Sequence, residues 1–281
     1  MTVTRRAVTG ARHAVKAASA AADRWRAPAA GVVVLLYHRV GGGSALEIDL
    51  DPARFDDQIA AVAATGRAVS LDDALEQVAA ASSSPALGNA PSSIVVTFDD
   101  GTADFVDVAL PILVRHRVPA TLYVATDFVE GEREFPAGGR PVSWSALRDA
   151  CATGLVSVGS HTHTHRLFDR ISEADAASEL DRSIELIGAR LDRPAPDFAY
   201  PKAVPGPPAI ARLVRERFRS AALAGTRVNP WHGTDPYRLA RSPIQVSDGM
   251  QYFERKLAGG MGLEDSLRRT MNRVRYAKAH T

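Results

Sequence analysis

Short runs of β-branched and other apolar residues alternate in this chain with longer segments of helical periodicity. Three of the runs, Val32–Leu36, Ile94–Phe98 and Ala120–Val124, have the length and composition of buried strands. Alternation of this kind without an internal repeat predicts a parallel α/β architecture, either closed or open. The chain has 281 residues, of which 46% are hydrophobic. That length suits one (β/α) barrel and requires no division into two globular domains.

Capping signals mark the beginnings of several helical segments. Asp51 can cap a helix that starts at Pro52, and Ser143 and Ser172 precede two further segments in the same way. No glycine-rich phosphate loop follows any strand, which disfavours nucleotide binding. We expect helices at 51–65, 71–81, 102–117 with a kink at Pro111, 143–152, 172–191, 208–218 and 264–278, and further strands at 155–158, 198–200, 220–223 and 244–246.

Two short segments flank the α/β domain, which we place at residues 31–250. Residues 1–30 form a basic, alanine-rich arm, and residues 251–281 form a helical tail. The arm lacks the apolar core of a signal peptide, because charged residues from Arg12 to Lys16 interrupt it. We expect a solvated lead-in or a basic amphipathic helix, hence a cytoplasmic protein or one in peripheral contact with an anionic membrane. No run suits a membrane span, and a net charge of +2 indicates no nucleic-acid partner.

Two adjacent carboxylates follow the strand at 94–98. Asp99 and Asp100 come directly after the buried run and are followed by Gly101. Neighbouring carboxylates raise each other's pKa unless a cation shares the site, and a bound metal removes that penalty. In an extended strand the two would point to opposite sides, so both can serve one site only across a turn, for which Gly101 supplies the backbone freedom. One Asp here would suggest a helix cap, whereas the pair favours a functional site.

A histidine cluster follows the strand at 155–158. Three of the 8 histidines, His161, His163 and His165, lie within five residues. Neutral imidazole is a common zinc ligand, and the i,i+4 spacing of His161 and His165 lets both reach one ion. The metalloprotease form of this spacing needs Glu where this chain has Thr162. One carboxylate and two histidines at strand ends therefore predict a three-ligand catalytic metal site, and the other carboxylate is free to act as a base.

Three segments resemble motifs of one enzyme family. Thr97–Gly101 and His161–His165 resemble, in residues, order and spacing, the first two motifs of the NodB-type polysaccharide deacetylases (carbohydrate esterase family 4). Leu36–Val40 is similar to the Tyr-His segment that opens many bacterial members. The resemblance extends over roughly residues 30–250. It implies a distorted (β/α)7 barrel and the hydrolysis of acetyl groups on carbohydrates.

The resemblance also implies a role for each matching residue. Asp99 would be the general base. Asp100, His161 and His165 would bind a divalent metal, zinc or a similar ion such as cobalt or nickel, and His163 would stay outside the ligand set. Such a metal polarises the acetyl carbonyl and lowers the pKa of a water. A backbone N–H would help to hold the oxyanion, and an acid would protonate the departing amine.

The chain departs from the family pattern in its third and last motifs. The stretch around Tyr200 offers the N–H for the oxyanion but lacks the arginine that supports the catalytic aspartate, and Arg241 is our candidate for that support. The late Leu-x-His motif, which supplies the acid in many members, is absent, so we assign the acid to His38 at the end of the first strand. For a sugar-stacking face we prefer Trp231, in a loop expected to be exposed, to Trp144.

Three functions stay open on the sequence alone. The first is a metal-dependent deacetylase that releases acetate from an N-acetylated carbohydrate, either a polysaccharide or a glycan intermediate. The second is a catalytically inactive carbohydrate-binding domain that keeps the metal, which the altered motifs would allow. The third is a metal-dependent hydrolase of another amide. The intact Asp99 and the complete ligand set favour the first.

Overall fold

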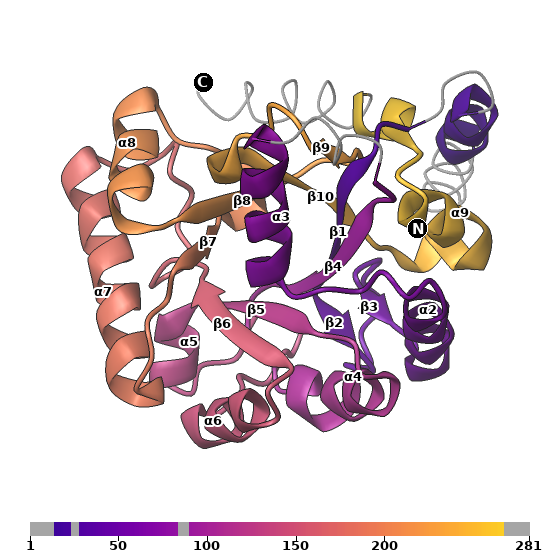
Figure 1. The fold of residues 1–281 in the computed structure, drawn as a ribbon. Helices are drawn as coiled ribbons and strands as arrows, with labels where there is room; N and C mark the ends of the chain where they lie inside the picture. The colour runs from indigo at the N-terminus through magenta and orange to yellow at the C-terminus, as the bar shows by residue number, and fades with distance from the viewer. Residues whose placement is uncertain (1–13, 24–27, 84–89, 267–281) are drawn as a thin grey trace.

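A closed ring of seven parallel strands is the centre of the computed structural model, which describes residues 14–23, 28–83 and 90–266 (Figure 1). In order round the ring the strands are β1 (Gly31–Tyr37), β4 (Ser93–Phe98), β5 (Ala120–Val124), β6 (Val156–Ser160), β7 (Asp197–Ala199), β8 (Ser220–Ala224) and β10 (Leu239–Pro243). Pairing of β10 with β1 closes the ring. Among the described residues only one pair, Ser160 with Phe198, joins β6 to β7, and this short pairing distorts the ring. The predicted distorted (β/α)7 barrel is confirmed.

Helices surround this ring, and the one at Leu71–Ser83 lies over it and packs on side chains of its interior (Figure 1). They are α2 (Pro52–Ala64), α3 (Leu71–Ser83), α4 (Leu110–His116), α5 (Thr126–Glu130), α6 (Trp144–Ala152), α7 (Glu173–Leu191), α8 (Pro208–Arg217) and α9 (Gly249–Leu257). The side chains of Asp51, Ser143 and Ser172 accept backbone N–H groups in the first turns of α2, α6 and α7, as predicted. Among the described residues no helix combines the length and the apolar character that crossing a membrane requires.

Short strands complete the sheet structure. They are β2 (Arg39–Val40), which pairs with β3 (Asp49–Leu50), and β9 (Asn229–Pro230), which runs antiparallel to β1.

Side chains alternate along the strands between the inside and the outside of the ring. Val34 of β1, Tyr123 of β5 and Ala222 of β8 belong to one buried cluster, although their strands lie on different sides of the ring. They can meet only in its interior. Residues of the opposite parity, such as Leu35 and Leu122, belong to the outer cluster with the surrounding helices. The two-residue period of a strand therefore decides which side chains reach the interior.

The last strand of the ring lies earlier than the apolar pattern predicts. We expected a strand at 244–246, but β10 occupies Leu239–Pro243, and Val246 is 51% exposed in a 3-10 turn. Pairing with β1 sets the register and places Arg241 opposite Val34. A buried arginine at an inward position hides such a strand from a search for apolar runs.

The helix expected from 102 to 117 is divided. Residues Phe105–Ala109 form a π-helical turn, and Leu110 donates its N–H to Phe105 O, five residues back. Pro111 then lies in the first turn of α4. Because proline has no N–H to donate to the residue four positions back, the wider turn accommodates the missing donor. A kink was expected at Pro111, and the change from the π-helical turn to α4 lies just before it, between Ala109 and Leu110.

The described part of the basic arm packs against the C-terminal segment. Residues 14–22 are helical, and the side chain of Lys16 is buried. Its ammonium group contacts Asp248 and lies 3.3 Å from a carboxylate oxygen of Glu264. The expectation of a solvated arm is therefore wrong for these residues. Residues 1–13, and most of the helix expected at 264–278, lie outside the described residues.

Candidate active site

Four of the predicted site residues share one structural origin. His38, Asp99 and His161 each come one residue after the end of a ring strand, namely β1, β4 and β6, and Arg241 lies within β10. Side chains two residues apart on a strand point the same way, so all four of these side chains point toward the inside of the ring, like the inward-facing residues of their strands. They therefore meet at the carboxyl end of the ring, where (β/α) barrels carry their active sites.

Asp99 and Arg241 form a buried two-point ion pair. Arg241 Nη1 and Nη2 donate to Asp99 Oδ1 and Oδ2 at 2.6 and 2.8 Å. Burial raises the pKa of Asp99, but the charges of Arg241 and His161 and the arginine hydrogen bonds outweigh it and lower the pKa to about 2. The carboxylate is thus ionised at neutral pH, and its oxygens keep further lone pairs. Arg241 makes the contact expected of a support, and it lies over the ring of Tyr123, 5.2 Å from its centroid.

A sharp turn after β4 aims Asp100 at the histidines. Asp100 has a φ of 77° and Gly101 a φ of 97°, so two consecutive residues are left-handed. Glycine adopts this region readily, and aspartate is among the few other residues that enter it. The N–H of Ala125 donates to Asp100 O at 2.9 Å and ties the turn to the end of β5. The turn predicted from Gly101 is confirmed, and it begins one residue earlier, at Asp100 itself.

Asp100, His161 and His165 bring three possible ligand atoms together. One atom of each lies within 4.8 Å of the other two. Asp100 Oδ1 is 3.7 Å from His161 Nε2 and 3.5 Å from His165 Nε2. These separations exceed hydrogen-bond lengths. They resemble the roughly 3.4 Å between two ligands that each bind one tetrahedral zinc ion at about 2.1 Å.

The state of the two imidazoles fits a metal as well. His161 Nδ1 donates to Ala199 O at 2.7 Å, so the proton sits on Nδ1 and the lone pair of Nε2 stays free. Burial, followed by the charge of His161, lowers the pKa of His165 to about 4. Its ring is therefore neutral at pH 7, the form that binds metals. One carboxylate and two imidazoles suit zinc and similar divalent ions.

His163 lies outside this trio. Its Nδ1 is 3.0 Å from Thr126 Oγ1, and its Nε2 is 3.8 Å from Asp127 Oδ1. The ring thus contacts α5, and its Nδ1 is occupied there. This placement agrees with leaving His163 out of the ligand set.

His38 reaches the same face as Asp99. Its positive charge, when present, lowers the pKa of Asp99, which places the two side chains near each other. The Nδ1 atom of His38 is buried and has no hydrogen-bond partner among the described residues. Buried polar atoms are nearly always partnered. The residue as a whole is only half-buried, so part of it stays in contact with solvent.

Tyr200 does not offer the N–H that we expected of it. That N–H donates to Ala222 O at 3.1 Å, and the ring packs against Phe198 at a centroid distance of 4.9 Å. The pairing of β7 with β8 continues to this residue and takes up the donor. Lys202, two residues later, has a left-handed φ of 50°, and its charge lowers the pKa of His165. The turn at Lys202 therefore approaches the histidines, whereas the Tyr200 N–H does not face them.

The prediction that Trp231 is an exposed stacking face is wrong. Its side chain is 4% exposed, and the indole N–H donates to Ala90 O at 3.0 Å. Its backbone N–H donates to Ala30 O, just before β1, so Trp231 lies at the end of the ring opposite Asp99. The surrounding loop is rich in turn-forming residues, but burial of the large apolar ring favours an inward position.

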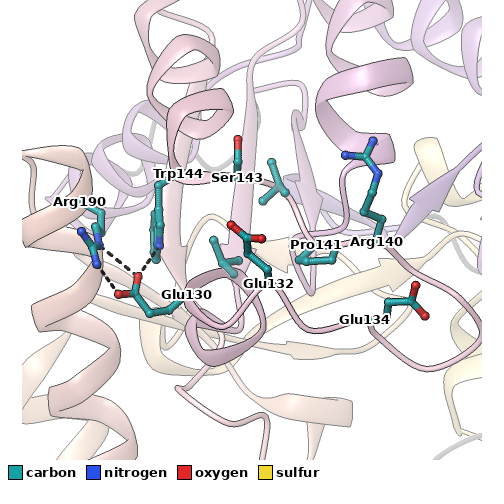
Figure 2. A pocket seen from close by; sticks show the side chains of 10 residues that line it. Glu130, Glu132, Glu134, Arg140, Pro141, Ser143, Trp144 and Arg190 are labelled. Carbon is teal, nitrogen blue, oxygen red and sulfur yellow. Dashed lines mark hydrogen bonds and ion pairs between the residues drawn. The ribbon is translucent and has the colours of Figure 1, made fainter.

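Trp144 lines an open cavity of about 620 Å³ (Figure 2). Its indole N–H donates to Glu130 Oε2 at 2.7 Å, and the same carboxylate binds Arg190. Val142, also in the wall, donates its N–H to Gly101 O at 3.0 Å, which connects this cavity to the turn after Asp100. Of these two tryptophans, Trp144 is the one that a ligand in solution can reach. Other lining residues are Val129, Glu132, Glu134, Arg140, Pro141 and Ser143.

Glu179 of α7 is a residue of this region that sequence reasoning missed. Its carboxylate is 7% exposed and accepts the N–H groups of His163 and Thr164 at 3.0 and 2.7 Å. Ala176 and Ser183, three residues before and four after, are buried on the same helix face. An acid on the buried face of an amphipathic helix is the signal that could have identified it.

The fold and the site define a (β/α)7 barrel with a possible metal site at the carboxyl end of its strands. The family model for polysaccharide deacetylase matches residues 88–215. That span contains Asp99, Asp100, His161 and His165. Over this span the chain is similar to polysaccharide deacetylases.

Two curated relatives have similar sequences. A chitooligosaccharide deacetylase from Bradyrhizobium sp. (strain ANU 289) is 31% identical over 154 residues, which cover 54% of this chain and 61% of the relative. A chitin deacetylase from Colletotrichum lindemuthianum is 34% identical over 110 residues, which cover 38% of this chain and 40% of the relative. The chain thus spans less than two thirds of the length of each.

Solved structures show the same fold over most of the chain. The deacetylase PplD from Streptococcus pyogenes, in complex with acetate, has a TM-score of 0.66 at 20% identity, and the match covers 81% of this chain and 98% of that one. IcaB from Ammonifex degensii has a TM-score of 0.69 at 23% identity and covers 82% and 98%. At these identities the likeness concerns the fold.

Proposed function

We propose that this chain is a metal-dependent de-N-acetylase that hydrolyses acetyl groups of an N-acetylated carbohydrate and releases acetate. One observation supports this most: a three-ligand set, Asp100, His161 and His165, lies beside the ionised, buried Asp99. We favour zinc, with cobalt or nickel as alternatives. The two relatives named for chitin and chitooligosaccharide support the substrate class.

The residues of the site divide the work of amide hydrolysis. A divalent metal at Asp100, His161 and His165 would polarise the acetyl carbonyl and lower the pKa of a water at the site. Asp99 accepts a proton from that water as the water oxygen bonds to the carbonyl carbon. Arg241 keeps Asp99 ionised and oriented through its two hydrogen bonds. The C–N bond then breaks, and acetate leaves with the water oxygen.

We assign protonation of the departing amine to His38. The leaving nitrogen needs a proton as the C–N bond breaks, and imidazole is the side chain whose ordinary pKa lies nearest to neutrality. His38 follows β1 on the face that carries Asp99, and its buried Nδ1 has no hydrogen-bond partner within the described part of the chain. The Arg241 contact keeps Asp99 a weak base, so the two protonation roles fall to different groups.

The test is acetate release by the whole chain. The protein is stripped with a chelator, reconstituted with Zn²⁺ or Co²⁺, and assayed on a panel of N-acetylated oligosaccharides. We expect metal-dependent release that falls by about 10³-fold or more in Asp99→Asn, with metal content unchanged, and by about 10²-fold in His38→Ala. The exposed Asp57→Asn and His232→Ala variants are matched controls and should retain activity.

Other outcomes identify the alternatives. Metal binding without acetate from any substrate would favour an inactive carbohydrate-binding domain, and release of a different acid from another amide would favour the third function. Loss of metal in Asp99→Asn would reassign Asp99 to the ligand set. Absence of metal binding by the unaltered chain would overturn the proposal.

A further inference from the structure

Side chains satisfy every backbone N–H of the segment 162–165, which joins the two histidine ligands. Thr162 N–H donates to Ser160 Oγ at 3.2 Å, and His165 N–H donates to Thr162 Oγ1 at 3.0 Å. The two N–H groups between them, those of His163 and Thr164, both donate to Glu179 Oε2, at 3.0 and 2.7 Å. The hydroxyl of Thr164 also donates to the other carboxylate oxygen of the same glutamate. The carbonyls of Thr162 and His163 accept the N–H groups of Thr126 and Asp127 in the first turn of α5, at 3.2 and 2.9 Å, so α5 and these side chains together determine the shape of the segment.

The segment also contains two disfavoured backbone conformations. Thr162 has a φ of 67° and His165 a φ of 62°. The left-handed region is uncommon for residues other than glycine and is a genuine outlier for a β-branched residue such as threonine. Such conformations persist where the surroundings fix them. The direction of the His165 ring therefore depends on groups that hold the backbone on either side of it.

Helix α7 supplies those groups. Glu179 and Ser183 are four residues apart and both buried on the face of α7 that meets this segment. Ser183 Oγ is 2.6 Å from Ser160 Oγ, and Ser160 in turn accepts the N–H of Thr162. Glu179 makes the other contact, to the middle of the segment.

Glu179 has no cation to neutralise it. Among the described residues no lysine, arginine or histidine lies within ion-pair distance of its carboxylate, which is 7% exposed. A buried charge is costly unless it is well hydrogen-bonded, and here two N–H groups and a hydroxyl fulfil that requirement. All of these hydrogen bonds come from the segment that joins the two histidine ligands. The position of the carboxylate is therefore explained by its contacts with that segment and not by an ion pair in the core.

We propose that Glu179 is a positioning residue for the metal site, a role that rests on the proposed function. By fixing the two N–H groups between the ligands, its carboxylate holds the turn in which the Nε2 atoms of His161 and His165 converge near Asp100. The apolar residues of α7, among them Leu180 and Ile187, anchor the helix independently. Removal of the carboxylate should therefore loosen the ligand segment and leave the barrel folded.

Metal affinity is the measurement that tests this role. Zn²⁺ and Co²⁺ dissociation constants are determined for the full chain by competition with a chromogenic chelator, and the Co²⁺ absorption spectrum is recorded. Glu179→Ala should bind either metal at least tenfold more weakly, with an altered Co²⁺ spectrum. Glu179→Gln keeps one acceptor oxygen for both N–H groups, and its amide can donate to Thr164 Oγ1, so it should stay within about threefold of the unaltered chain.

The control is Glu185→Ala, an acid on the same helix whose side chain is 65% exposed. It should bind metal as the unaltered chain does. Equal affinities for Glu179→Ala and the unaltered chain would overturn the role of Glu179. If Glu179→Ala does not fold, Glu179→Asp decides, because it keeps the charge and shortens the reach; unchanged affinity there would overturn the role as well. An unaltered chain that binds metal but releases no acetate contradicts the deacetylase alone, whereas one that binds no metal contradicts both proposals.

Discussion

Two groups of buried charged residues, one near the termini and one at the candidate active site, differ in how many of their members form direct ion pairs. Near the termini, Asp248 accepts two hydrogen bonds of 2.9 Å from Lys256 and contacts Lys16, and Glu264 lies 3.3 Å from Lys16. Two cations and two carboxylates thus neutralise one another. At the candidate active site, Asp99 is paired with Arg241 in the same manner.

The three ligand residues of the site do not pair with one another in this way. Asp100 Oδ1 stays 3.5 Å and 3.7 Å from the nearest nitrogens of His165 and His161. Distances of this kind leave the lone pairs of all three residues available, because none of them is used in a hydrogen bond within the trio. Burial of charge alone therefore does not identify a functional site. The distinguishing feature is a set of convergent groups whose mutual distances suit a shared ion better than a direct contact.

The largest loss of stability is expected when the ion pair between Asp99 and Arg241 is removed. Arg241→Met leaves the Asp99 carboxylate buried without its partner, and loss of one member of a buried pair costs about 3–5 kcal/mol of the free energy of unfolding. Denaturant unfolding measures the loss. The double variant Asp99→Asn, Arg241→Met should recover part of it, because the unpaired charge is gone. A loss below about 1 kcal/mol in the single variant would show that the pair contributes little to the fold.

Metal addition should stabilise the molecule by a somewhat smaller amount. At a hundred times its dissociation constant, an ion that binds only the folded state adds about 2.7 kcal/mol. The midpoint of thermal unfolding of the chelator-treated protein should rise accordingly on addition of Zn²⁺. His165→Ala should lose this rise, and the exposed control His232→Ala should keep it. A rise that survives in His165→Ala would place the ion elsewhere.

The terminal cluster should affect stability without affecting chemistry. Lys16→Met removes one of the two cations that contact Asp248 and leaves the other, so we expect a loss of about 1–3 kcal/mol. The exposed control Arg54→Met should change stability by less than about 0.5 kcal/mol. Acetate release per folded molecule should be the same for Lys16→Met and the unaltered chain. Reduced activity at full stability would mean that the two charge clusters are coupled.

Local patterns predicted the strands and a metal site of one carboxylate and two histidines, because each depends on short segments, whereas the closed ring and the choice of Asp100 as the ligand came from the family resemblance. Apolar runs locate most of the strands, and the strand ends carry Asp99 and His161 to one face by parity alone. Gly101 predicted the turn that directs Asp100 toward the histidines. The capping residues of the helices are local in the same sense. For these features a window of a few residues contains the whole physical cause.

Features that depend on tertiary pairing were not predictable in this way. Trp231 was expected to be exposed but is buried, because its indole N–H donates to Ala90 O and its ring packs in the apolar cluster inside the barrel. The Tyr200 N–H is taken by Ala222 on the adjacent strand. Glu179 accepts hydrogen bonds from residues that lie 15 and 16 positions earlier in the chain, across a helix boundary. In each case the partner decides the role, and the partner is distant in sequence.

The smallest effect is expected at an exposed pair, which extends the comparison to charges in water. Hydrogen bonds from His116, and then from Arg115, lower the pKa of Asp56, whose side chain is 39% exposed. Because its folded pKa is lowered, the stabilisation is complete above the unfolded pKa of about 3.9 and is lost as the pH falls through the folded value. Solvent screening limits it, so Asp56→Asn should cost at most about 0.5 kcal/mol near pH 6. Urea unfolding from about pH 6 down to pH 3 should show this difference shrinking, with Asp57→Asn as the exposed control. A cost that grows on acidification, or one as large as that of Lys16→Met, would remove the distinction between exposed and buried pairs drawn here.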